Sequence, residues 1–142
     1  MPLRCLAVDF NSFFASCEQQ EHPRLRGKPL GIVPVVAEST CCIAASYPAK
    51  ARGVRVGTGL AEARQLCPGI EFIEARPKVY IDYHRRLLAV IESCLHVTEI
   101  RSIDEMECDL TATFAPREKA LAVAYEIKTQ VARRVGLSLI HI

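Results

Sequence analysis

The sequence has no hydrophobic run long enough to cross a membrane. A membrane-spanning helix needs about 20 consecutive apolar residues, and every apolar stretch of this 142-residue chain is far shorter. The start, Met1-Pro2-Leu3-Arg4, is not followed by the apolar segment and small-residue cleavage site of a secretory signal. We therefore expect a cytoplasmic protein without a membrane partner.

The chain also lacks the cysteine spacing of a disulfide-rich or zinc-binding protein. Its seven cysteines are odd in number and scattered, without a CxxC pair or a histidine at ligand spacing. We interpret them as reduced thiols, most of them buried, because free cysteine packs as a small hydrophobic residue.

An excess of one charge is missing as well. The chain has 18 basic and 16 acidic residues, a net charge of +2, whereas a protein that binds nucleic acid unaided is usually strongly basic. Half of the residues are apolar, which is enough for the packed core of one domain.

Apolar periodicity and turn residues predict an α+β fold. The outer segments form a nearly complete βαββαβ, ferredoxin-like arrangement into which 20–76 is inserted, and no residues remain for its last strand. We expect strands over 3–8 and 30–35, short helices over 12–20, 42–54 and 59–69, a long helix from 77, two strands around a turn at 102–105, and a last helix over 116–136.

Three carboxylates are candidates for a metal site. Asp9 ends the first strand, and Asp104 and Glu105 occupy the later hairpin turn. In a ferredoxin-like sheet we expect the first strand to lie beside the strand leading into this hairpin, so that the three acids converge. Such a cluster repels itself unless a cation is bound, and hard oxygen ligands suit Mg²⁺. The alternative is that Asp9 caps the next helix and that the other two merely solvate a turn.

The residues after Asp9 favour the metal site over this alternative. Asn11 or Ser12 can cap a helix, and the N–H groups from Asn11 to Phe14 would face a triphosphate held on the metal, because helix N-termini attract phosphate. Phe13 and Phe14 would lie beside the sugar, where a flat ring can exclude a hydroxyl. For Phe13 we expect core packing to be the main role.

Four segments together resemble the successive motifs of the Y-family, translesion DNA polymerases, in the same order and at similar separations. They are VDFNSFFASCEQ, LRGKPLGIV, IAASYPAKARGVRVG and SIDEMECDLT, and the resemblance covers about residues 3–136. AKARGVRVG and Asn11 are similar to the UmuC-like branch, and the general run is similar to DinB-type enzymes. The resemblance implies template-directed deoxynucleotidyl transfer in DNA repair and damage tolerance, with two Mg²⁺ ions, a primed DNA template and a deoxynucleoside triphosphate.

By the same resemblance, 1–19 and 77–136 belong to an incomplete ferredoxin-like palm and 20–76 to a small inserted fingers subdomain. The site residues that it implies are Asp9, Asp104 and Glu105 as catalytic acids and metal ligands, the Phe10 carbonyl as a further ligand, Asn11, Ser12 and Phe13 at the nucleotide, Phe14 as the gate that tests its sugar, and Tyr47 and Lys50 on its triphosphate. Many relatives carry arginine at the position of Lys50, whose point charge replaces a bidentate fork.

The closing LSLIHI matches one reading frame of a transposon sequencing adapter, which indicates a non-native tail over 137–142. The last palm strand, the thumb and the DNA-gripping domain of the family do not follow, so we expect the chain alone to be inactive. The sliding clamp or recombinase that recruits such enzymes would bind those missing parts. Two alternatives remain, a non-catalytic accessory subunit that serves as a scaffold and a nucleotidyl cyclase. The three intact acids argue against the scaffold, and the insertion with Tyr47 and Lys50 argues against the cyclase.

Overall fold

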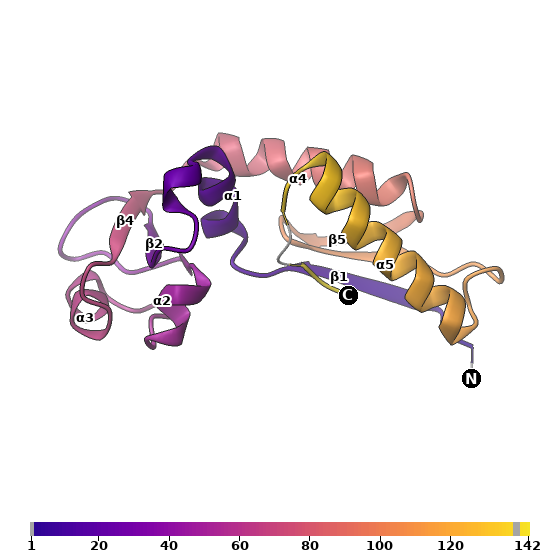
Figure 1. Cartoon of the computed structure of the whole chain (residues 1–142), viewed down its shortest axis with the longest axis horizontal. Coiled ribbons are helices and arrows are strands. Elements are labelled where there is room, and N and C mark those ends of the chain that lie inside the picture. Colours follow the sequence, from indigo (N-terminus) through magenta and orange to yellow (C-terminus); the bar gives the residue numbers. More distant parts are fainter. Residues whose placement is uncertain (1, 138–139) are drawn as a thin grey trace. The chain divides into compact units, whose positions relative to one another are not determined.

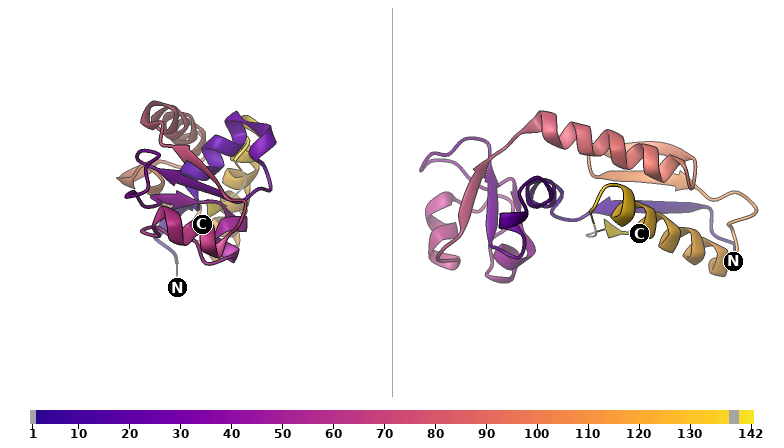
Figure 2. Two further views of the ribbon diagram at one scale, coloured as in Figure 1. Left: turned by 90° about the vertical axis from the view of Figure 1, so that its left-hand side faces the viewer. Right: turned by 45° about the horizontal axis from the view of Figure 1, so that its top comes forward.

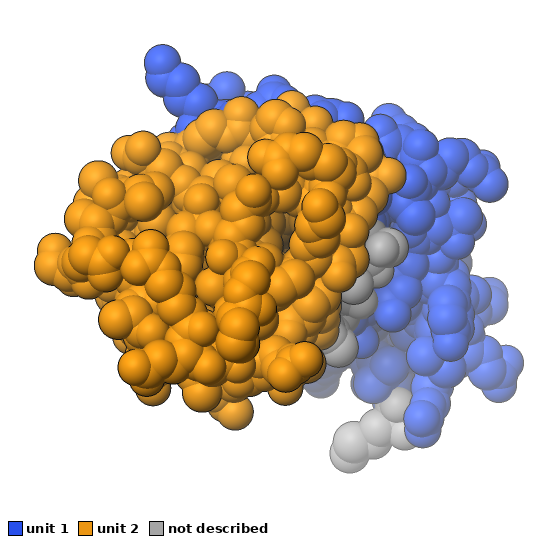
Figure 3. Space-filling model, turned by 60° about the vertical axis from the view of Figure 1, so that its left-hand side comes forward, with its two compact units in different colours: residues 1–11, 78–142 blue, residues 12–77 orange. Residues whose placement is uncertain are grey.

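A computed structural model describes residues 2–137 and 140–142 of the chain, which folds into two units. One unit contains residues 1–11 and 78–142, and the other contains residues 12–77 (Figure 3). The chain passes between the units twice, at 11–12 and at 77–78. We call them the sheet unit and the inserted unit.

The sheet unit contains a four-stranded antiparallel sheet and two long helices (Figure 1). Its strands run in the order β5-β6-β1-β7. Figure 2 shows both helices beside the strands of this unit. The elements are β1 (Cys5–Phe10), α4 (Pro77–Glu92), β5 (Val97–Ser102), β6 (Glu105–Asp109), α5 (Arg117–Arg134) and β7 (Ile140–His141).

Alternation along β1 and β6 gives the sheet one buried and one open face. Val8 and Met106 are register partners and both are buried beneath the helices, whereas the next pair, Asp9 and Glu105, lies on the opposite face. Ile127 of α5 is fully buried. The core therefore lies between the helices and one face of the sheet, and the carboxylates lie on the other face.

Two sequence-based expectations for this sheet are corrected. β1 pairs with β6, the strand that leaves the hairpin, and not with β5, which leads into it. The tail was expected to leave β1 without a last strand, but β7 pairs with it at Asp9 and Phe10. Residues 138 and 139 of the predicted tail lie outside the described residues.

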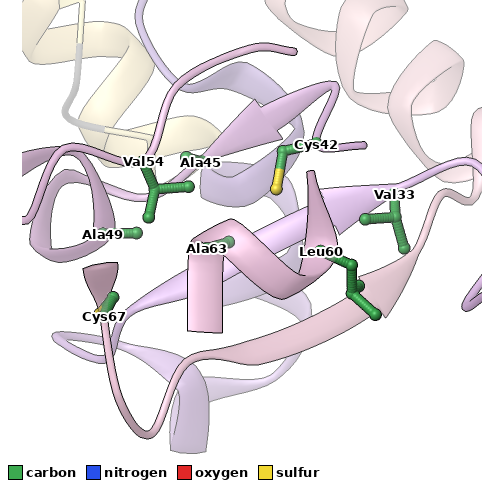
Figure 4. Packing of buried hydrophobic residues seen from close by; sticks show 8 residues of the cluster. All are labelled: Val33, Cys42, Ala45, Ala49, Val54, Leu60, Ala63 and Cys67. Atoms are coloured by element: carbon green, nitrogen blue, oxygen red, sulfur yellow. The ribbon is translucent and has the colours of Figure 1, made fainter. Parts of the chain in front are cut away.

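The inserted unit contains a three-stranded sheet, ordered β3-β2-β4, with β2 antiparallel to β3 and parallel to β4. Figure 4 shows the core beneath it, which is built from small side chains such as Ala45, Ala49 and Ala63 together with Leu60. The elements are α1 (Phe13–Glu21), the 3-10 helix η1 (Pro23–Leu25), β2 (Leu30–Val33), β3 (Ala44–Ala45), α2 (Tyr47–Ala51), α3 (Leu60–Leu66) and β4 (Glu71–Glu74).

The prediction of one helix over 42–54 is wrong in its first part, where β3 pairs with β2. The Ser46 hydroxyl accepts a hydrogen bond from the Leu30 amide at 2.8 Å and donates one to the Lys28 carbonyl at 3.0 Å, which ties this segment to β2. The helix begins only at Tyr47, where Pro48 can occupy its first turn.

Strand β4 was not predicted at all. It is short, and it pairs with β2 so that Phe72 lies opposite Gly31. A Cβ atom on Gly31 would lie 3.1 Å from Phe72 Cδ1 and 3.2 Å from Cys42 Sγ. The pairing thus depends on a contact between segments that are far apart in the sequence.

The cysteines are free thiols, as the sequence predicts, and four of the seven are buried. Burial raises the pKa of the Cys108 thiol to about 11 and also raises the pKa of Cys42. Both therefore stay protonated at neutral pH and pack as small apolar side chains. Within the described residues, the helices are all too short or too polar to span a membrane.

An ion pair between a buried carboxylate and a half-buried arginine ties α1 to the last residues of the inserted unit. Arg76 donates from Nε and Nη2 to the two carboxylate oxygens of Glu18, at 2.8 and 2.7 Å, and the Glu18 side chain is only 1% exposed. A bidentate pair of this kind has well-defined geometry and short charge-assisted bonds.

Replacing Arg76 by alanine should lower the free energy of unfolding by about 3 kcal/mol, because a buried carboxylate then loses its bidentate partner. Arg24→Ala is the matched control. Arg24 pairs with Glu71 at 3.2 Å, but both side chains are largely exposed, so its loss should cost less than about 1 kcal/mol. Urea unfolding followed by circular dichroism measures both values, and equal losses would contradict the prediction.

Candidate metal and nucleotide site

Three carboxylates meet on the open face of the sheet unit. Asp9 lies near the end of β1, Asp104 lies in the hairpin turn, and Glu105 begins β6. One carboxylate oxygen from each lies within 4.8 Å of the others. Asp9 and Glu105 are register partners on neighbouring strands, so the antiparallel ladder itself brings their side chains onto the same face.

The alternative role for Asp9, as a helix cap, does not fit the structure. Asp9 lies within β1, and the residue at the N-cap position of α1 is Ser12. The expected cap is also absent, because the Ser12 hydroxyl makes no capping hydrogen bond. The residue has a left-handed backbone, with φ of 51°, and its hydroxyl oxygen is buried without a hydrogen-bond partner among the described residues.

Hydrogen bonds fix the hairpin turn that carries two of the acids. The Phe10 amide donates to the Asp104 carbonyl at 2.9 Å, and the Ser102 hydroxyl donates to Oδ1 of Asp104 at 2.7 Å. On the helix side, Nδ1 of His84 lies 2.7 Å from the Ile103 carbonyl oxygen. The turn is thus held by β1 and by α4.

The three acids, which we call the carboxylate triad, have the chemistry of a site for a hard divalent cation. Three like charges this close are unfavourable alone and favourable around a cation. The next carboxylate on the same face, that of Glu107, already has a cationic partner. Its Oε1 lies 2.7 Å from Nη2 of Arg101. A Mg²⁺ ion therefore fits the oxygens of the triad better than those of its neighbour.

The residues predicted to bind the nucleotide divide between the two units. Phe10 and Asn11 lie with the triad in the sheet unit, while Ser12, Phe13, Phe14, Tyr47 and Lys50 belong to the inserted unit. Phe13 is 3% exposed, as expected for core packing, and Phe14 is half-buried. The centres of the Phe13 and Phe14 rings are 5.9 Å apart.

Tyr47 and Lys50 lie together on the short helix α2. Both are exposed, and Nζ of Lys50 lies 5.4 Å from the centre of the Tyr47 ring. This is within the range of a cation–π contact. A phenol and an ammonium group on one helical turn can both contact an anionic ligand.

Sequence reasoning missed two residues that hold the site, His84 and Ser102. His84 had a signal, because it lies four residues after Tyr80 and three before Leu87, both buried in α4. A polar residue within an apolar helical stripe indicates a specific partner. Ser102 had none, since serine is common in turns.

Two known proteins are similar in sequence to most of this chain. The chain is 33% identical over 134 residues to a DNA polymerase IV of Bacteroides fragilis. The matched region covers 94% of this chain and 36% of the relative. It is 36% identical over 137 residues to a DNA polymerase IV of Moorella thermoacetica, covering 94% of this chain and 34% of the relative. The chain thus spans about a third of these relatives' length.

Solved structures give the same result. An insertion ternary complex of Dbh DNA polymerase has a TM-score of 0.87 and 25% identity, and the match covers 97% of this chain and 41% of that one. A Y-family DNA polymerase chimera of Dbh and Dpo4 matches with a TM-score of 0.86 and 26% identity over 93% of this chain and 40% of its own. A family model, impB/mucB/samB, matches residues 8–140. The chain therefore belongs to the impB/mucB/samB family and resembles the Y-family DNA polymerases.

Proposed function

We propose that this chain carries the catalytic acids and part of the nucleotide site of a translesion DNA polymerase. The observation that carries the proposal is the convergence of Asp9, Asp104 and Glu105 within 4.8 Å on an open sheet face, in a chain whose relatives are named DNA polymerase IV. The reaction joins the 3′-oxygen of a primer to the α-phosphorus of a deoxynucleoside triphosphate, and pyrophosphate leaves.

In this proposal the triad holds two Mg²⁺ ions, with the Phe10 carbonyl as a further ligand. Bound there, the ions would activate the primer hydroxyl and neutralise the charge of the departing pyrophosphate. The contribution of the chain itself is to hold the carboxylate oxygens of the triad in place. Asp9 and Glu105 do so from paired strands, and the Phe10 amide fixes the Asp104 backbone. The alternative of a non-catalytic scaffold does not account for three converging like charges.

The sheet unit would be the palm and most of the inserted unit the fingers. The strand order β5-β6-β1-β7, together with the β-α-β-β-α-β order of the elements in this unit, supports a ferredoxin-like palm. Helix α1, which the sequence analysis gives to the palm, lies in the inserted unit by its contacts. Primed DNA would be bound with the help of parts that the relatives have beyond the matched third of their length.

The inserted unit would supply contacts to the incoming nucleotide. The unsatisfied Ser12 hydroxyl at the start of α1 supports a polar ligand there, because buried hydroxyl groups usually have a partner. Phe14 would meet the sugar at its 2′ position. Tyr47 and Lys50 would contact the triphosphate from α2.

Neutralising one acid should weaken cation binding by this 142-residue chain. We expect Asp9→Asn, Asp104→Asn and Glu105→Gln each to weaken Mn²⁺ binding, measured by calorimetry, by about tenfold or more, or about 1.4 kcal/mol. Thermal stability without metal should hold or rise slightly, since repulsion is relieved. Asp109→Asn, at the other end of β6, is the matched control.

In a full-length polymerase carrying this segment, the same three changes should slow primer extension by about 100-fold or more. A variant of the triad with normal extension would remove that residue from the catalytic set.

Removing the Phe14 ring should reduce discrimination against ribonucleotides. In single-nucleotide insertion assays with a full-length polymerase, Phe14→Ala should lower the preference for deoxynucleotides by about tenfold to a hundredfold, because the ring no longer excludes the 2′-hydroxyl. Phe14→Tyr keeps the ring and should keep the preference. Unchanged selectivity in Phe14→Ala would mean that another residue, with Phe13 the next candidate, is the gate.

Loss of the Lys50 charge should weaken nucleotide binding more than DNA binding. Lys50→Ala should raise the KM for the incoming nucleotide by about tenfold, the usual effect of one charge-assisted contact, and leave the DNA affinity nearly unchanged. Lys28→Ala, another exposed lysine of the inserted unit, is the control. If DNA affinity falls as much as nucleotide affinity, Lys50 does not contact the triphosphate.

A further inference from the structure

A histidine outside the carboxylate triad contacts the backbone of the hairpin turn, next to Asp104 and Glu105. His84 lies in the middle of α4, and its Nδ1 is 2.7 Å from the carbonyl oxygen of Ile103, the residue before Asp104. A carbonyl oxygen only accepts hydrogen bonds, so Nδ1 carries the proton and donates. The bond joins positions 19 residues apart in the sequence.

Helix α4 is a firm support for this bond. Its 16 residues include Tyr80, Tyr83 and Leu87, which are all buried beside the sheet. His84 lies among them and is half-buried, so its ring has little freedom to turn away. Partial burial also strengthens the bond relative to one in open water.

The two peptide groups on either side of Asp104 are therefore held from opposite elements. The Ile103 carbonyl is held by His84 of α4, and the Asp104 carbonyl accepts the Phe10 amide of β1 at 2.9 Å. The Ser102 hydroxyl additionally holds the Asp104 carboxylate at 2.7 Å. If the first of these bonds is lost, the peptide between Ile103 and Asp104 can rotate, and the direction of the Asp104 side chain changes with it.

We propose that His84 is a positioning residue for the triad, and that its hydrogen bond to Ile103 orients Asp104 and Glu105 for binding a divalent cation. The inference rests on the proposed function, because it requires the triad to bind metal. Residues that orient metal ligands affect metal affinity although they do not touch the ion.

The variants at position 84 separate positioning from simple packing. His84→Ala removes the donor. His84→Asn places an amide N–H close to the position of Nδ1, since both are attached to Cγ, whereas His84→Gln has the same amide one carbon further out. A packing role alone would favour the larger glutamine, while a positioning role requires asparagine to restore function. His96→Ala, which removes an exposed histidine of the same unit, is the control.

The test measures Mn²⁺ affinity of the 142-residue chain by calorimetry and hydrogen exchange at the Phe10 amide by NMR, without DNA or nucleotide. We expect His84→Ala and His84→Gln to weaken Mn²⁺ binding by about tenfold or more and to speed exchange at Phe10. His84→Asn and His96→Ala should match the unsubstituted chain. If His84→Ala does not fold, the comparison of asparagine with glutamine gives the same answer.

The possible failures are distinct. If the unsubstituted chain and Asp9→Asn bind Mn²⁺ equally, the metal site of the proposed function is wrong, and the role of His84 falls with it. If Asp9→Asn loses binding but all three variants at position 84 retain it, the metal site stands and the positioning role of His84 is wrong. Glutamine restoring affinity better than asparagine would also overturn the proposal.

Discussion

Repulsion among three carboxylates is the constraint on which the rest of this structure depends. Asp9, Asp104 and Glu105 come within 4.8 Å of one another, an arrangement that isolated side chains in water would avoid. The β1–β6 ladder makes Asp9 and Glu105 neighbours, and the buried partners one step along, Val8 and Met106, prevent the ladder from slipping. A slip of one residue would turn the acids into the core and the apolar residues into water. The burial of apolar side chains on one face of the sheet thus holds the three carboxylates close together on the other face.

The sequence predicts those parts of the fold that depend on local patterns. The long helix from residue 77 has apolar residues at helical spacing and is observed as α4, Pro77–Glu92. The last helix is bounded by Pro116 and by Gly136, whose φ of 92° ends it in a left-handed conformation. The convergence of Asp9 with the hairpin acids was also predicted and is observed, although the prediction placed the wrong strand of the hairpin beside β1.

Other features escaped prediction because they depend on partners distant in sequence. Strand β3 has only two residues and exists because β2 lies beside it. The choice of β6 over β5 as the neighbour of β1 depends on the topology of the whole sheet. Asn11 or Ser12 was predicted to cap α1, but Ser12 at the N-cap has a left-handed backbone, and its buried hydroxyl makes no capping hydrogen bond. A backbone strained in this way is typical of functional sites.

The double crossing between the two units has a consequence for how such a chain can vary. The inserted unit begins at residue 12 and ends at residue 77, and the Glu18–Arg76 pair joins its first helix to the residue before its exit. A segment whose two ends are tied to each other is structurally independent of the unit into which it is inserted. It can change in length or sequence between them without altering the distance that the host sheet must bridge. The inserted unit can thus change while Asp9, Asp104 and Glu105, which lie on either side of it in the sequence, keep their places in the sheet unit.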